Sequence, residues 1–201
     1  MKKISILMVP IVLLLLNGCE KDELDNVKAD SFNGTIKAQV ENGESYNSQI
    51  SKVWALFDAK LNGNQLTGRM VNDSPFTDGG FNLNLPELPE QYLMNIQTFF
   101  AELVKESDKL EISNPEARLL DVDFFGISGS DNYVDYFVYA NSGSKRSTCL
   151  FVYVDSDATV KGGNNVAIKL KKGWNRLYVS SDKITSNAPK DMKWYLRRDV
   201  Q

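Results

Sequence analysis

The sequence predicts a mainly β protein, an antiparallel β-sandwich with one short amphipathic helix near residues 91–104. Three observations support this prediction. From residue 32 onward, apolar and polar residues alternate with a period of two, which is typical of half-buried strands. Turn-forming residues separate these stretches at intervals of roughly 8–12 residues, as in β-sandwiches. Only residues 91–104 repeat their apolar residues at the three- and four-residue spacing of a helix.

The first half of the chain shows the alternation most clearly. Residues 36–40 (IKAQV) place Ile, Ala and Val on one face and Lys and Gln on the other. Residues 61–64 (LNGN) contain an Asn-Gly turn signal, so the runs on either side of them are expected to pair as a β-hairpin. The strands expected in this half are residues 36–40, 53–57, 66–71 and 81–85.

The expected helix, residues 91–104, has one apolar face. We expect this face to pack against an open side of the sheet rather than to bind a partner protein. The residues that form it are Tyr92, Ile96, Phe99, Phe100, Leu103 and Val104.

The second half contains the strands that we expect at the centre of the sheet. Residues 133–140 and 147–155 are apolar or aromatic on both faces, which is typical of strands covered on both sides. Residues 141–144 (NSGS) supply a turn between them, so these two strands are expected to pair. The other strands of this half are expected at residues 117–126, 166–170, 177–179 and 192–196.

The N-terminus has the organisation of a secretory signal. Lys2 and Lys3 precede an apolar stretch, residues 4–16, which is shorter than the roughly 20 residues that cross a membrane. Residues 16–19 (LNGC) resemble the lipobox of bacterial lipoproteins, with Asn where a small residue is usual. This resemblance implies cleavage before Cys19 and attachment to a membrane through acyl chains on Cys19.

The predicted organisation has three parts: a signal peptide (residues 1–18), an acidic tether after the lipidated Cys19 (residues 19–31), and a single β-sandwich domain (residues 32–201). Residues 20–26 (EKDELDN) resemble the export signal that follows the acylated cysteine in surface lipoproteins of Bacteroidetes. This resemblance implies an outer-membrane location facing the cell exterior. The same composition, rich in charge and poor in apolar residues, also suits a solvated flexible tether.

Four short motifs further along the chain resemble a family. They are residues 81–86 (FNLNLP), 151–155 (FVYVD), 170–175 (LKKGWN) and 193–195 (KWY). Together they are similar to uncharacterised Bacteroidetes surface lipoproteins with a β-sandwich domain. The resemblance implies an immunoglobulin- or transthyretin-like sandwich, and it implies no activity, because a fold alone does not specify one.

Composition excludes several kinds of chemistry. The chain has no histidine, which removes Ser-His-Asp and Cys-His catalysis and nearly all catalytic zinc sites. With Cys19 acylated, Cys149 is the only remaining thiol, so we expect it to be buried, inert and outside any intrachain disulfide. The net charge of −3 and the lack of a dense basic patch argue against nucleic acid as a partner. We expect no cofactor.

The three tryptophans are candidates for ligand binding, because an exposed indole can stack on a sugar ring. Trp54 and Trp194 lie within expected strands and are expected to be buried. Trp174 follows a glycine at the start of a strand and is the candidate for a ligand-binding residue. Burial is the simpler expectation for Trp174 as well.

Acidic residues are the other candidates. Asp155 and Asp157 precede a pair of glycines and could begin a Ca²⁺ loop, but the spacing of an EF-hand is absent and a plain strand-to-turn transition is expected. Two further pairs each place two carboxylates on one strand face, as a two-carboxylate glycosidase requires, although such pairs are usually surface acids. These pairs are Asp121 with Asp123, and Asp131 with Asp135.

The function expected from the sequence is that of a lipid-anchored cell-surface protein that is not an enzyme. It would bind a glycan, a peptide or a protein of the envelope. One alternative is a structural subunit of an envelope assembly, held through an edge strand or through the helix at residues 91–104. The other is a hydrolase that uses paired carboxylates.

Overall fold

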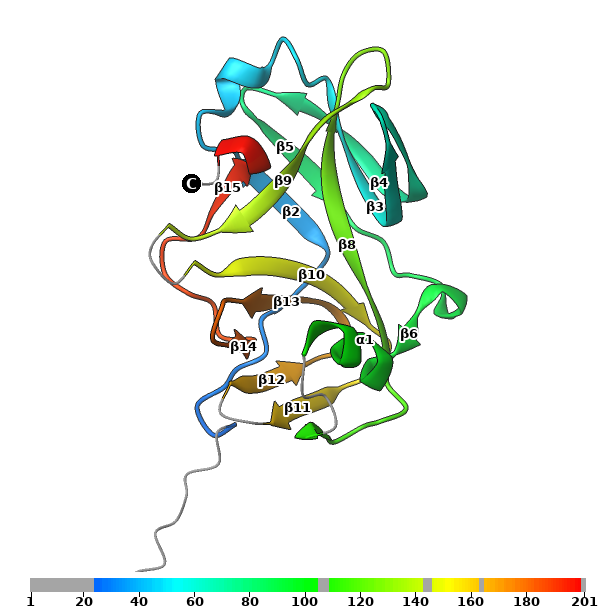
Figure 1. The fold of residues 1–201 in the computed structure, drawn as a ribbon, viewed down its shortest axis with the longest axis vertical. Helices are drawn as coiled ribbons and strands as arrows, with labels where there is room; N and C mark the ends of the chain where they lie inside the picture. The colour runs from blue at the N-terminus through cyan, green and yellow to red at the C-terminus, as the bar shows by residue number, and fades with distance from the viewer. Residues whose placement is uncertain (1–23, 105–108, 143–145, 163–164, 200–201) are drawn as a thin grey trace, which may run out of the picture.

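The computed structural model describes residues 24–104, 109–142, 146–162 and 165–199. The signal peptide, Cys19 and the start of the acidic run lie outside the described residues. One curled sheet runs through the described part of the chain, and its neighbouring strands are mostly antiparallel (Figure 1). The predicted mainly β architecture with one short α-helix is confirmed.

The strands of the sheet are given in their spatial order. They are β2 (Thr35–Gln39), β5 (Gly80–Asn84), β4 (Gln65–Thr77), β3 (Lys52–Asn62), β8 (Arg118–Ile127), β9 (Tyr133–Ala140), β10 (Thr148–Val154), β13 (Gly173–Val179), β14 (Ile184–Thr185), β12 (Val166–Leu170), β11 (Ala158–Gly162) and β7 (Glu111–Ile112). Three short strands pair beside this path: β1 (Ser31–Phe32) with β13, β6 (Met94–Asn95) with β8, and β15 (Lys193–Leu196) with β9. The helices are α1 (Ile96–Leu103) and the 3₁₀ turns η1 (Gly43–Tyr46), η2 (Glu90–Tyr92) and η4 (Arg197–Asp199).

Strand β8 lies at the centre of the sheet because both of its edges carry partners. One edge pairs with β3 and β6, while the other pairs first with β10 and then with β9. The expected pairing between residues 133–140 and 147–155 is therefore limited to one position, where Ala140 pairs with Thr148. Because β9 and β10 occupy successive stretches of the same edge of β8, they separate, and their free edges pair with β15 and β13.

The sheet curls around an aromatic core. Trp194 stands at the centre of this core, with ring centroids 5.2 Å from Phe81, 5.5 Å from Phe124 and 5.4 Å from Phe151. A parallel bridge between Val40 and Trp194 joins the chain after β2 to β15, so the series of strands from β2 through β8 and β9 to β15 closes on itself. The predicted burial of Trp194 is confirmed, since it is 6% exposed.

Helix α1 covers a second core on the other face of the sheet. Ile96 and Phe100 are buried against Leu119 and Val152 of the sheet, as the sequence predicts for the apolar face of this helix. The helix begins at Ile96 because the side chain of Asn95 caps it, accepting a hydrogen bond from the Gln97 N–H (2.8 Å).

The helix is shorter than the expected residues 91–104. Tyr92, which the periodicity assigns to its apolar face, lies in η2 and packs its ring 5.3 Å from the ring of Phe57. The same spacing of apolar residues therefore serves two separate contacts, one from a turn and one from a helix.

Residues 24–31, expected to belong to a tether, lie against the domain. Val27 is 5% exposed, and the Lys28 N–H donates to the side-chain oxygen of Asn187 (2.9 Å). Strand β1 then pairs with β13. The packed domain therefore starts before residue 32, because one buried valine and a set of hydrogen bonds offset the polar composition of this segment.

Candidate functional site

The hairpin of β3 and β4 folds back over the outer face of β8. The fold starts at Asp58, whose φ of 51° is left-handed and which lies in a break of the β3–β4 register. Across the hairpin, a side chain on Gly68 would come within 3.2 Å of the backbone of Ala59, so glycine allows this close approach. The tip is held by the Tyr133 N–H, which donates to the carbonyl of Asn64 (3.1 Å).

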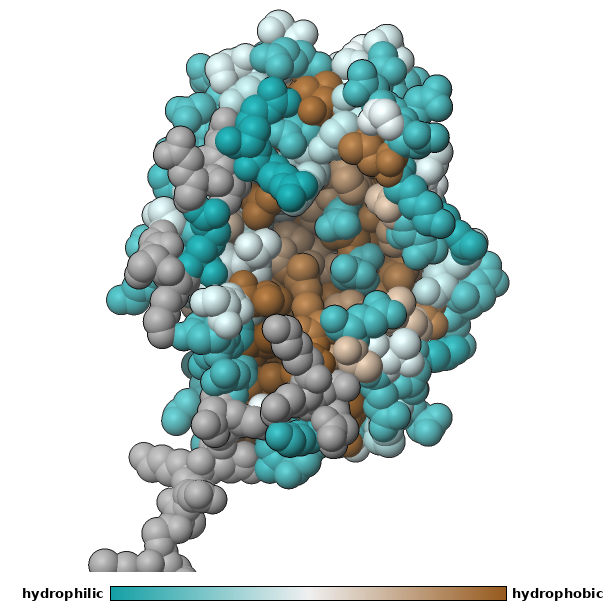
Figure 2. Space-filling model, viewed as in Figure 1, coloured by the Kyte–Doolittle hydropathy of each residue, from teal (hydrophilic) through white to brown (hydrophobic). Residues whose placement is uncertain are grey.

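The folded-back hairpin and α1 cover opposite ends of this outer face. Ala59 and Leu66 of the hairpin pack on a cluster that includes Phe125 and Ile127 near the end of β8. Helix α1 packs on the cluster that contains Leu119 near the start of β8. Figure 2 shows that the face between these two ends is hollowed, with apolar residues inside and hydrophilic residues around it.

We call this hollow the trough. Its floor includes Asp121 and Asp123 of β8, which lie on one face because they are two residues apart in a strand. Their cross-strand neighbours are apolar: Val152 pairs with Asp121, and Leu56 pairs with Asp123. The trough is therefore an apolar surface with two carboxylates at its centre.

A pocket lies at the α1 end of the trough. Its volume is about 210 Å³, and it opens between the helix and the sheet. Four of its lining residues are apolar and two are carboxylates. They are Met94, Phe99, Glu102, Leu103, Asp121 and Leu150.

The surroundings of the two carboxylates raise their pKa values. The Asp123 side chain is exposed, but the protein atoms packed around it still remove part of its water; this is the main cause, and the charge of Asp121 adds to it, raising the pKa of Asp123 to about 6. Partial burial likewise raises the pKa of Asp121, and the charges of Glu102 and Asp58 add to this effect against a hydrogen bond from its own backbone. Both carboxylates therefore bind protons at a higher pH than an ordinary aspartate does.

Other acidic side chains near the core are paired with cations. Asp135 accepts from the Arg198 Nε (2.8 Å), Asp155 from the Arg118 Nε (3.1 Å), and Asp30 from the Arg176 Nη1 (3.1 Å). In the described part of the chain, neither Asp121 nor Asp123 has such an ion pair or a side-chain hydrogen bond. A ligand with a positive charge is the complement that these two carboxylates lack.

Trp174, the weak ligand-binding candidate from the sequence, is buried, which confirms the simpler expectation and leaves no ring face for stacking. It is 4% exposed, and its Nε1–H donates to the carbonyl of Pro86 (3.0 Å). Its ring packs 5.4 Å from that of Tyr153 inside the sheet. Trp54, expected to be buried, is half-buried, with the Lys52 Nζ 5.6 Å from its ring centroid.

The Ca²⁺ candidates Asp155 and Asp157 hold strand ends together. Asp155 accepts from the Arg118 backbone N–H (2.9 Å) as well as from its side chain. Asp157 accepts from the Lys171 Nζ (2.6 Å) and the Lys172 N–H (2.8 Å). Among the residues that the structure describes, no group of three acidic or cysteine side chains could hold a metal ion.

The second carboxylate pair, Asp131 and Asp135, is separated by the structure. Asp131 lies in the turn before β9, with a φ of 61°, and forms an ion pair with the Lys52 Nζ. Asp135 lies within β9, is 7% exposed and is paired with Arg198. Their even spacing does not put them on one face because only one of them lies in the strand.

The remaining thiol behaves as the sequence predicts. Cys149 is 7% exposed, and burial raises its pKa well above the usual value, which makes the thiol unreactive. In the described ranges, no helix is both long and apolar enough to cross a membrane.

Comparisons with known proteins give no relative: no family model, curated protein or solved structure matches the chain.

The sequence indicates only part of the trough. The outer-face positions of β8 read Leu119, Asp121, Asp123, Phe125 and Ile127, so two acids interrupt an apolar strand face. These two acids are the signal in the sequence that could have identified the site. The positions of the hairpin and the helix on either side of them could not be predicted, because they depend on the tertiary fold.

Proposed function

We propose that this protein is a lipid-anchored, cell-surface binding module without catalytic activity, and that its ligand lies in the trough. The observation that carries the proposal is the pair Asp121 and Asp123, two carboxylates without an ion pair on the outer face of β8, one of which lines a mainly apolar pocket. Such an arrangement costs folding free energy, and a ligand that supplies the missing contacts recovers it. The anchor rests on Cys19 and on the resemblance of residues 16–26 to lipoprotein signals.

The geometry favours binding over carboxylate catalysis. In a glycosidase, one carboxylic acid and one ionised carboxylate flank the bond that breaks. Asp121 and Asp123 instead project side by side from the same face of one strand, so they do not flank a bond from two sides as the carboxylates of a glycosidase do. Hydrolysis of a glycan by this protein would overturn the non-catalytic assignment.

The geometry also favours a peptide or protein over a sugar. Sugar recognition by stacking needs an aromatic face open to solvent. Trp174 and Trp194 are buried, and Trp54 is partly covered by Lys52. Tyr136, which lies near the trough, has the Arg197 guanidinium 4.8 Å from its ring centroid. Two of these four rings are therefore buried, and each of the other two is partly buried and has a cation over one face.

Two measurements test the location. Replacing Cys19→Ala should prevent acylation and release the protein from the membrane fraction, while Cys149→Ala, the matched control, should leave it there. Protease treatment of intact cells should digest the wild-type protein. Protection of the wild type in intact cells would contradict exposure on the outer surface.

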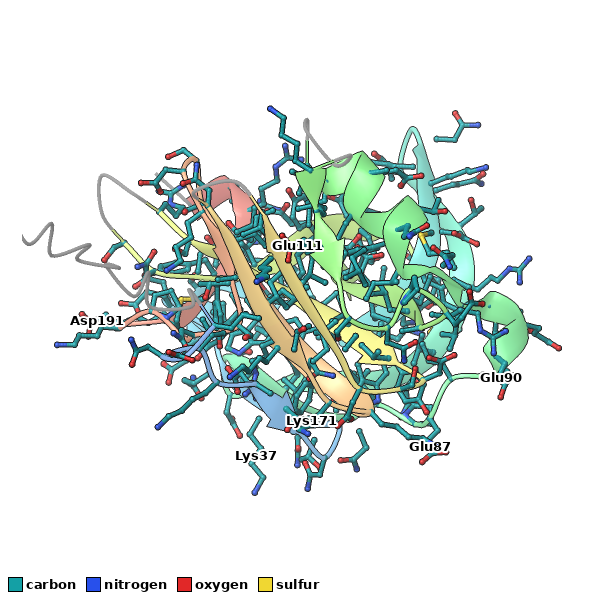
Figure 3. The ribbon with its side chains drawn as sticks, turned by 90° about the horizontal axis from the view of Figure 1, so that it is seen from below. Lys37, Glu87, Glu90, Glu111, Lys171 and Asp191 are labelled. Atoms are coloured by element: carbon teal, nitrogen blue, oxygen red, sulfur yellow. The ribbon has the colours of Figure 1, made fainter. Side chains whose placement is uncertain are left out.

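The trough is tested by filling it. Leu150→Trp puts a larger side chain into the wall of the pocket, while Lys37→Trp puts the same side chain on β2, which Figure 3 shows projecting from the side opposite α1. Both variants, with the wild type, are screened against a displayed peptide library and a glycan array. Ligands retained by the wild type and Lys37→Trp should be lost with Leu150→Trp. Ligands that bind all three proteins equally would show that binding occurs elsewhere.

A further inference from the structure

We propose that the ligand of the trough is a peptide segment of a partner protein that carries an apolar side chain and a Lys or Arg within four residues of it. The inference rests on the proposed binding function and names the chemistry of the ligand. It follows from the size of the pocket, the carboxylates beside it and the distance between the two.

The apolar half of this recognition is the pocket. Pockets for drug-sized ligands have volumes of about 300–1,000 Å³. At about 210 Å³, this pocket is smaller and suits one or two side chains of a larger partner. Met94 and Leu103 form part of its lining, and methionine adapts its shape to different apolar side chains. The pocket therefore anchors a side chain rather than enclosing a whole small molecule.

The charged half is the row of acids that runs from α1 to the folded-back hairpin. The negative charges of Glu102 in α1 and Asp58 in β3 repel that of Asp121, and Asp123 lies beside Asp121 on the same strand. An ammonium or guanidinium group placed here removes the repulsion between Asp121 and Asp123. It also forms charge-assisted hydrogen bonds, which are stronger where water is partly excluded.

Two arginines among the described residues of these elements are held by other contacts. Arg69 is 3.9 Å from Asp58 and has its guanidinium carbon 4.9 Å from the ring centroid of Tyr92. Arg197 lies over Tyr136. Neither guanidinium group forms an ion pair with Asp121 or Asp123, so among the described residues the charge of these two carboxylates is not compensated.

The separation of the two halves points to a peptide. Asp121 lines the pocket, and Asp123 lies about 6.6 Å further along β8, at about 3.3 Å per residue of strand. Two residues of an extended peptide, or one turn of a helix, span a similar distance. A simple amine would satisfy the carboxylates and leave the pocket empty, and an anionic lipid would be repelled by four acids.

The test starts from a random-peptide display library selected on the purified protein at pH 7.5. Enriched peptides should contain Leu, Ile, Met or Phe with Lys or Arg within four residues. Calorimetry with the consensus peptide should then give at least a tenfold weaker affinity when its basic residue is replaced by Gln. The double variant Asp121→Asn/Asp123→Asn should bind the original peptide at least tenfold more weakly. Glu87→Gln, which removes an acid on the side of the molecule away from α1, should change nothing (Figure 3).

The outcomes separate this inference from the proposed function. Peptides that lack a basic residue, or that bind the double variant as tightly as the wild type, would overturn the cationic ligand. If those peptides, or glycans, are nevertheless displaced by Leu150→Trp, the trough remains a binding site for another ligand. If nothing selected is sensitive to Leu150→Trp, both the ligand class and the site are wrong. Unchanged circular dichroism of each variant shows that the fold is intact.

Discussion

The hydroxyl of Tyr178 donates a hydrogen bond of 2.5 Å to the Oδ2 of Asp30. Arg176 completes the contact, since its Nη1 donates to the Oδ1 of the same carboxylate (3.1 Å) and its backbone N–H donates to the Asp30 carbonyl (2.9 Å). Burial, reinforced by the bond to Asp30, raises the pKa of Tyr178. One carboxylate thus fastens the segment before β1 to β13.

Packing of the segment before β1 limits how far the domain can stand from an anchored Cys19. Val27, which is buried, lies eight residues after Cys19, and extended chain covers at most about 3.6 Å per residue, or about 29 Å in all. If Cys19 carries the acyl chains, this packing holds the domain closer to the membrane than a tether ending at residue 31, which would reach about 43 Å.

Removing the clamp should therefore destabilise the protein and lengthen the tether. We expect Asp30→Ala to lower the free energy of unfolding by about 1.5–3 kcal/mol, the range for hydrogen bonds to a charged group. Urea denaturation measures this loss, and hydrogen exchange at Phe32 should accelerate. Asp25→Ala, an exposed acid in the same segment, is the control and should have no effect. Equal stability of the two variants would mean that the segment is not held by Asp30.

Trp174 should behave as a core residue. It is 4% exposed and hydrogen-bonded to Pro86, so Trp174→Ala should lower the free energy of unfolding by about 3–5 kcal/mol, as for other large core truncations. Trp54→Ala should cost less, since Trp54 is only half-buried. Denaturation curves of both variants give the comparison. A Trp174→Ala protein of normal stability that loses a glycan ligand would restore the stacking role.

The sequence predicted the elements well and their partners less well. Alternation placed strands such as β2, because it reports which face of a strand is buried. It could not show that β9 and β10 share one edge of β8, since edge use depends on all strands at once. Likewise, the composition of residues 24–31 gave no sign of the clamp, whose partner carboxylate and arginine lie 146 residues apart.

The candidate site illustrates the same limit. Two acids in the strand face at Asp121 and Asp123 were visible in the sequence as a pair. Their surroundings depend on Asp58, where the hairpin turns back, and on α1, which forms a pocket with Asp121. Each of these features is an ordinary local structure, and the trough arises only where both meet β8.

The unpaired charge in the trough should reduce stability at neutral pH. The pKa of Asp123 is raised to about 6, so the folded state binds its proton more tightly than the unfolded chain. The resulting stabilisation is complete below about pH 4 and is lost as the pH rises through about 6. Asp123→Asn should therefore increase the free energy of unfolding at pH 7.5 by about 1 kcal/mol, a value reduced for solvent screening. Urea denaturation at pH 7.5 and 4 measures this gain, which should vanish at the lower pH. Glu87→Gln should leave stability unchanged, and a destabilised Asp123→Asn protein would contradict an unpaired carboxylate.

Binding of a basic peptide should weaken as the pH falls, because protons and the cation compete for the same carboxylates. Asp121 lies beside Asp123, and the charges of Glu102 from α1 and Asp58 from the hairpin act on Asp121. Tyr136 from β9, with Arg197 over its ring, is the other described group near Asp123. Since the pKa of Asp123 is about 6, affinity should hold between pH 7.5 and 7 and fall at least threefold by pH 5. Calorimetry across this range measures the fall. In Asp123→Asn, affinity should be lower at pH 7.5 and nearly independent of pH down to 5.5, because the carboxylate that takes up the proton is gone. A wild-type affinity that is flat over the same range would show that Asp123 does not contact the cation.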